Sequence, residues 1–199
     1  MNAEDYTWFA KTHLYEAYCL TLVRGLGRSD ALARIDAEPT GSVFGLMNFI
    51  NYAYDNASWR TGSPFPIGAV ELDGWTLLVE ANGFLGVTAA VIRPLSAGTR
   101  VVSHYRNVDA EDRFCWMDDG ELRLQFEPLF PYIREGSEPD SLIDVMRQVG
   151  FDLRNIEDHD YELHTEAAFA LAEHLTGVRL TYELLDTADY LCGLAALKR

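Results

Sequence analysis

The chain is short of positive charge. Its 199 residues include 16 lysines and arginines against 31 aspartates and glutamates, which gives a formal net charge of −15. A surface of this sign repels nucleic acid and anionic lipid, because proteins bind both mainly by neutralising phosphate groups. We therefore expect no nucleic-acid partner and no membrane, and a basic protein is the partner that such a field attracts. Solubility alone also accounts for many acidic surfaces, so that alternative stays open.

Cysteine is scarce as well, and the chain has no long apolar run. Cys19, Cys115 and Cys192 are far apart and form no CxxC pair. An odd number of thiols among apolar neighbours is typical of reduced, buried cysteines in a reducing compartment. The acidic start, MNAEDYTWFAKTH, lacks the apolar segment of a signal peptide, and no stretch reaches the ~18 apolar residues that cross a bilayer. We expect a soluble, cytoplasmic protein.

Strong catalytic motifs are missing too. The most suggestive stretch is ELDGWTLLVEANGFLG (71–86), in which Asp73-Gly74 and Asn82-Gly83 flank an apolar run. A phosphate-binding loop needs spaced glycines that lead into a helix and, in a P-loop, a lysine; this stretch has neither. Both dipeptides are typical of turns. Since no serine or cysteine lies in a nucleophile elbow, we predict no catalytic residue and no cofactor.

What the sequence does contain is strand patterns in its middle and helical patterns toward both ends. Asp73-Gly74 and Asp119-Gly120 each separate two strand-like segments and have the chemistry of a type I′ hairpin turn. We predict an α+β fold: an antiparallel sheet of about five or six strands with two β-hairpins, packed against N-terminal helices and a C-terminal helical hairpin. The predicted strands are 18–25, 67–72, 75–81, 99–107, 113–117 and 121–127, and the longer predicted helices are 43–54, 141–150, 165–177 and 181–191.

We expect a single domain over residues 1–199. Its first part, 1–66, is predicted to be mainly helical with one strand. Residues 67–131 are predicted to be rich in strands, and residues 132–199 to be helical. No internal repeat or linker-like composition divides the chain.

Five segments carry a family resemblance. They are CLTLVRGL (19–26), GWTLLVEANGFLG (74–86), SAGTRVVSHYRNVDAEDRFCW (96–116), LRLQFEPLFP (122–131) and HTEAAFALAEHLTGVRLTYELLD (164–186). They resemble an actinobacterial domain family of unknown function, and the similarity covers most of the chain. The resemblance implies one domain in a bacterial cytoplasm, and it transfers no activity and no site residue.

One candidate ligand site lies on the predicted strand 99–107. Because side chains alternate along a strand, His104 and Arg106 share one face. With Arg24 and Arg113 from neighbouring strands they would form a small cationic cleft for a carboxylate or a phosphate. That arrangement would make the protein a small enzyme or ligand-binding domain. The alternative is that these residues are exposed and paired with acidic neighbours.

A second polar cluster is EDHDYELH (157–164). Histidine and carboxylate side chains are suitable ligands for zinc or a first-row metal. However, His159 and His164 are five residues apart, which suits neither one face of a helix nor one face of a strand. The HExxH pattern is also absent. We therefore predict no metal site here and read the cluster as a solvated loop before a helix.

The acidic charge is concentrated in one stretch. Residues 135–166 hold ten acidic residues and two basic ones. Charge alone gives steering more than affinity, so an apolar anchor is also needed, and Trp59, in a turn-rich loop, is our candidate. We nominate Asp158, Asp160 and Glu162 as the charged contacts. The favoured function is a non-catalytic protein–protein interaction module (an immunity-like or antitoxin-like inhibitor, or an accessory subunit) that binds a basic partner.

Overall fold

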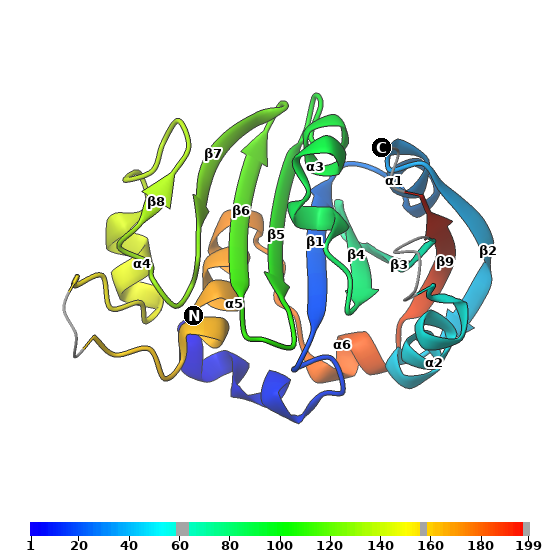
Figure 1. The fold of residues 1–199 in the computed structure, drawn as a ribbon, viewed down its shortest axis with the longest axis horizontal. Helices are drawn as coiled ribbons and strands as arrows, with labels where there is room; N and C mark the ends of the chain where they lie inside the picture. Colours follow the sequence, from blue (N-terminus) through cyan, green and yellow to red (C-terminus); the bar gives the residue numbers. More distant parts are fainter. Residues whose placement is uncertain (59–63, 156–158, 197–199) are drawn as a thin grey trace.

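A computed structural model describes residues 1–58, 64–155 and 159–196, and within them nine strands form one antiparallel sheet. The strands are β1 Tyr18–Arg24, β2 Ala37–Phe44, β3 Phe65–Leu72, β4 Trp75–Ala81, β5 Arg100–Arg106, β6 Asp112–Asp118, β7 Glu121–Phe126, β8 Arg134–Glu135 and β9 Asp189–Ala195. Their order across the sheet is β2-β9-β3-β4-β1-β5-β6-β7-β8, as Figure 1 shows. The predicted α+β class is confirmed.

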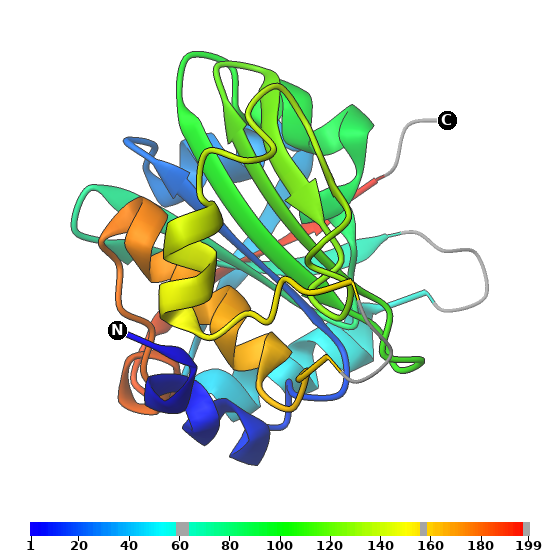
Figure 2. The same ribbon diagram turned by 90° about the vertical axis from the view of Figure 1, so that its left-hand side faces the viewer.

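Helices cover both faces of this sheet (Figure 2). In β4, Leu77 and Val79 pack into one apolar cluster and Leu78 into the other, as the two-residue period of a strand requires. The first cluster includes residues of η1 Ala3–Lys11, α2 Leu46–Asn56, α4 Ile143–Val149, α5 His164–Thr176 and α6 Tyr182–Asp186. The second includes residues of α1 Arg28–Arg34, η2 Leu85–Val87 and α3 Ala89–Leu95.

Both predicted hairpins form. Asp73-Gly74 joins β3 to β4, and Asp119-Gly120 joins β6 to β7. In the second turn both residues have positive φ, 49° for Asp119 and 75° for Gly120, as a type I′ turn requires. In the first turn only the glycine does, with φ of 71°, so the type I′ geometry expected there is not formed.

The 71–86 stretch is closed by a buried carboxylate. Asn82, with φ of 57°, ends β4 and redirects the chain. Glu80 then accepts hydrogen bonds from the backbone N–H groups of Leu85, at 2.9 Å, and Gly86, at 3.1 Å. A Cβ atom at Gly83 would overlap the Glu80 side chain. The amides that a phosphate would need are therefore already bonded, and burial raises the pKa of Glu80 to about 7.

The predicted number of strands, five or six, is wrong. One missed strand is β2, whose sequence AEPTGSVF contains Pro39 and Gly41 and therefore argues against a central strand. β2 lies at the edge of the sheet, and its register with β9 shifts between these two residues. An edge strand tolerates proline because one side of it makes no ladder bonds. The 1–66 segment accordingly holds a second complete strand.

The predicted C-terminal helical hairpin is also wrong. Thr181 caps α6 as its position suggests, accepting a bond from the Leu184 N–H at 3.0 Å. The helix nevertheless ends at Asp186, and β9 follows, inserted between β2 and β3. Apolar residues in this segment fit a helical period, but pairing on both sides with neighbouring strands stabilises the extended form. The segment 132–199 is therefore not all helical.

Candidate functional site

A buried polar cluster lies where β1, β5 and β6 meet the start of α5. The register places Tyr18 opposite Arg106 and Arg106 opposite Asp112. The Asp112 side chain is fully buried, and its Oδ2 atom lies 2.9 Å from Arg106 Nη1 and 3.1 Å from His164 Nε2. Arg106 Nη1 also donates to Thr165 Oγ1, at 3.1 Å. The buried carboxylate is therefore compensated by one guanidinium and one imidazole.

His164 connects this cluster to the surface. Its Nδ1 atom lies 2.5 Å from the Tyr161 carbonyl oxygen, so both ring nitrogens have acceptors when the ring is protonated. Burial by itself lowers the pKa of His164, but the hydrogen bonds to Asp112 and Tyr161 and the charge of Asp112 outweigh it. The net pKa lies above its usual value. The arrangement favours the imidazolium form.

His104 behaves in the opposite way. Burial lowers its pKa to about 4, so the ring is neutral at physiological pH. Its Nδ1 atom lies 3.2 Å from the Tyr18 hydroxyl oxygen. Among the described residues, two buried side-chain atoms have no hydrogen-bond partner, His104 Nε2 and Asp112 Oδ1. Both belong to this cluster, and such atoms in a folded protein call for a physical explanation.

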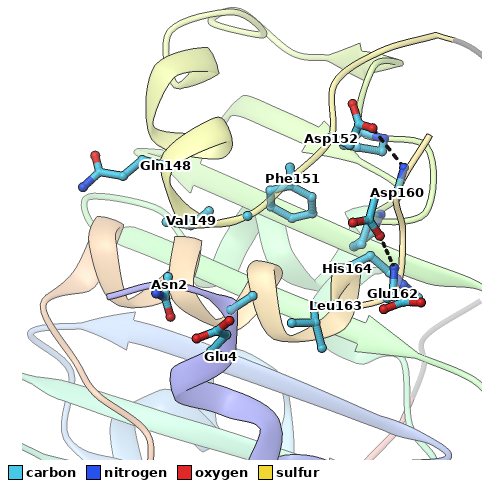
Figure 3. A pocket seen from close by; sticks show the side chains of 14 residues that line it. Asn2, Glu4, Gln148, Val149, Phe151, Asp152, Asp160, Glu162, Leu163 and His164 are labelled. Carbon is cyan, nitrogen blue, oxygen red and sulfur yellow. Dashed lines mark hydrogen bonds between the residues drawn. The ribbon is translucent and has the colours of Figure 1, made fainter.

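A hollow of about 310 Å³ opens beside His164 (Figure 3). It lies between the start of η1, the end of α4 and the start of α5. Among its lining residues are four carboxylates and the imidazole: Glu4, Asp152, Asp160, Glu162 and His164. Pro128, Pro131, Val149, Phe151 and Leu163 supply apolar walls.

The four carboxylates differ in the number of hydrogen bonds and ion pairs that they make within the chain. Asp152 pairs with Arg154 and accepts from the Asp160 N–H at 2.9 Å, and these contacts hold its pKa well below the usual range. Asp160 accepts from the Glu162 N–H at 3.1 Å. Within the described part of the chain, the carboxylates of Glu4 and Glu162 have no hydrogen-bond or ion-pair partner. The hollow therefore keeps unneutralised negative charge.

Comparison with protein families gives one match. The Family of unknown function (DUF6461) matches residues 1–199 of the chain. The chain belongs to this family. No curated protein and no solved structure matches it. The match confirms that the chain resembles a domain family of unknown function over most of its length.

The four predicted ligand residues of this DUF6461 chain do not share one site. His104 and Arg106 lie together on one face of β5, in the buried cluster. Arg113 pairs with Tyr105 in the register of β5 and β6, so it faces the other side of the sheet. Arg24 lies at the far end of β1 from Tyr18, about 20 Å away at 3.3 Å per residue.

The predicted partner contacts are placed in part. Asp160 and Glu162 line the hollow beside His164. Trp59 and Asp158 lie outside the described residues. Tyr161, between the two acidic residues, is 54% exposed, and its ring centroid lies 5.5 Å from that of His159. It is an exposed aromatic side chain beside the hollow that the sequence analysis did not nominate. Its flanking acidic residues are the only local signal that could have indicated it.

Glu4 and Asp152 were also missed. Glu4 reaches the hollow because η1 packs against α5, a contact that has no local sequence signal. Asp152 reaches it because the chain turns after α4; Gly150 indicates the end of the helix but not where the chain goes next. In ranges 1–58, 64–155 and 159–196, no three histidine, cysteine or carboxylate side chains are placed so that they could hold one metal ion. His159 instead lies 3.0 Å, through Nε2, from the Leu129 carbonyl oxygen.

The three cysteine thiols are buried in the core. Cys19, Cys115 and Cys192 are free and buried, as predicted. Burial raises the pKa of Cys115 to about 12, so its thiolate is disfavoured and the side chain is a poor nucleophile. Across the described segments, no helix has both the length and the apolar character to cross a membrane.

Proposed function

We propose that this chain is a non-catalytic interaction module that binds a basic protein and places an arginine or lysine side chain of that partner in the hollow beside His164. The observation that carries the proposal is the pair of carboxylates, Glu4 and Glu162, that face one hollow without a cation from the described chain. The lining holds four carboxylates against one imidazole, and a recess with an excess of negative charge attracts a positive one.

The hollow offers charge and apolar contact together. Glu4 and Glu162 gain a partner on binding without giving up one of their own, so the desolvation cost falls on groups that lose no existing bond. Tyr161 stands beside them with much of its ring exposed. Aromatic residues are frequent energetic centres of interfaces, so Tyr161 supplies the anchor that charge alone lacks.

A module of this kind has two obvious uses. It can neutralise a basic toxin or enzyme, as an immunity-like or antitoxin-like inhibitor, or it can hold a basic subunit in an assembly. The proposed setting is a bacterial cytoplasm, and three buried free thiols support a reducing compartment.

The test compares two variants of equal net charge. Glu4→Lys with Glu162→Lys reverses the charge of the hollow. Glu38→Lys with Asp55→Lys makes the same change on β2 and α2, at the other edge of the sheet (Figure 1). Association rates are measured with a basic partner obtained by affinity capture.

The hollow variant should slow association at least about tenfold and flatten its salt dependence. The edge variant should change the rate about twofold, as expected for charge remote from the interface. Equal rates for the two variants would show that the acidic surface only solubilises the protein, and the proposal would fail.

A second candidate function is ligand binding at His104 and Arg106. It is favoured by the two buried atoms without partners, His104 Nε2 and Asp112 Oδ1, which lie in the same cluster. A small molecule that donates to Asp112 Oδ1 and forms a second hydrogen bond with His104 Nε2 would satisfy both atoms. A metabolite screen by thermal shift tests this. A ligand should raise the melting temperature of the wild type and leave that of His104→Asn unchanged, and equal shifts would refute the candidate.

A further inference from the structure

A second hollow lies at the opposite end of the central strands, and its lining is cationic. It has a volume of about 710 Å³ and is bounded by the ends of β1 and α1, the start of β5 and the β6–β7 turn. This turn is at the top of Figure 1. The charged residues in its lining are Arg24, Arg34, Arg100, Arg123, Asp118 and Asp119. Four positive and two negative groups leave +2 in the lining of a chain whose net charge is −15.

Two of the four arginines are neutralised within the chain. Arg100 makes two parallel hydrogen bonds to Asp118, at 3.0 and 2.9 Å. Arg123 pairs with Glu121 at 3.0 Å and with Glu138 at 3.1 Å. These contacts hold the two side chains in place. The carboxylates largely neutralise the charge of Arg100 and Arg123.

Within residues 1–58, 64–155 and 159–196, the other two arginines have no carboxylate partner. Arg34 donates through Nη1 to the carbonyl oxygens of Leu95, at 3.2 Å, and Ala97, at 2.7 Å, so its position is fixed while its charge is not cancelled. In the described part of the chain, the Arg24 guanidinium has no hydrogen-bond or ion-pair partner. The Asp119 carboxylate bonds to the backbone, because its Oδ1 accepts a hydrogen bond from the Gly98 N–H at 2.7 Å.

We infer that this hollow binds a small anion with more than one negative charge, through the guanidinium groups of Arg24 and Arg34. A guanidinium group presents N–H donors in a planar fork that matches two oxygens of a phosphoryl or carboxylate group. The volume lies within the range of sites for small molecules. The acidic remainder of the surface favours a small anion, because a long polyanion would also meet like charge.

This site differs from the proposed protein interface in position and in sign. Arg24 stands at one end of β1, whereas His164 is connected to the other end through Asp112 and Arg106. The hollow beside His164 carries carboxylates where this one carries guanidinium groups. Either function can therefore fail without the other.

Isothermal titration calorimetry with inorganic pyrophosphate and, separately, with citrate tests the inference. Arg24→Gln is the main variant, because the Arg24 side chain bonds to none of the described residues and its backbone contacts remain in the variant. Arg34→Gln is the second, with its melting temperature recorded to check that it folds. Arg147→Gln is the control, since Arg147 is exposed, pairs only with Asp144 among the described residues, and carries the same charge.

Saturable binding to the wild type, weakened about tenfold or more in Arg24→Gln and unchanged in Arg147→Gln, is the expected result. Tighter binding of pyrophosphate would assign a phosphorylated ligand, and tighter binding of citrate a polycarboxylate. Absence of binding by both probes at millimolar concentration would overturn the inference. An equal loss in Arg24→Gln and Arg147→Gln would also overturn it, because net charge alone would then account for the binding.

Discussion

Replacing Glu80 with glutamine should change how the stability of the protein depends on pH. The Glu80 carboxylate is buried and closes the turn after β4 through the N–H groups of Leu85 and Gly86. Desolvation opposes its ionisation more strongly than these bonds favour it, so its pKa rises from 4.5 to about 7. The folded state therefore holds this proton more tightly than the unfolded state does.

The difference between the folded and unfolded pKa of Glu80 sets the sign and the size of the pH dependence of stability. A raised carboxyl pKa contributes stability that is fully present below about pH 4.5, declines as the pH rises, and is gone above about pH 7. A gap of about 2.5 pH units corresponds to roughly 3 kcal/mol, since each unit is worth about 1.4 kcal/mol. The Glu80→Gln variant has no proton to lose, so this decline should disappear.

The assay is urea unfolding followed by circular dichroism at several pH values from 4 to 8. The free energy of unfolding of the wild type minus that of Glu80→Gln should fall by roughly 3 kcal/mol across this range. Glu38→Gln, on the exposed edge strand, is the control and should track the wild type. Parallel curves for wild type and Glu80→Gln would refute a raised pKa for the buried Glu80 carboxylate.

Three further predictions concern packing, turns and thiols. Gly86→Ala should lower the free energy of unfolding by about 1–3 kcal/mol, because the added Cβ overlaps the Thr21 and Ser103 side chains; a wild-type melting curve would contradict this packing. Gly120→Val should cost a few kcal/mol, since φ is 75° at this position, and unchanged melting would remove the hairpin assignment. The cysteines should react with a thiol reagent only after unfolding, and a native disulfide or a fast-reacting Cys115 would disprove the assignment.

The parts of the fold that sequence could predict are those with a strong local signal. β4 runs from Trp75 to Ala81 as predicted, because a turn dipeptide stands at each end of an apolar, β-branched run. The segment after α6 shows the limit of such reasoning. Its apolar residues fit a helix equally well, and the decision in favour of β9 comes from pairing with β2 and β3, which lie far away in the sequence.

The two hollows also differ in how far local sequence could predict them. Asp160 and Glu162, which line the first hollow, were nominated because acidic charge is dense in one stretch of sequence. Glu4 joins them only through the packing of η1 against α5. The arginine hollow has no sequence signature at all, because Arg24, Arg34, Arg100 and Arg123 come from four different elements. Spacing along the chain carries no information about such a site.

The most direct test of the central claim is the affinity of a fluorescent, arginine-rich peptide, measured by anisotropy against the two double variants of equal charge. If the hollow beside His164 receives a basic side chain, Glu4→Lys with Glu162→Lys should weaken binding about tenfold more than Glu38→Lys with Asp55→Lys. If the two variants weaken binding equally, the peptide senses only net charge, and the hollow is not a binding site for a basic partner.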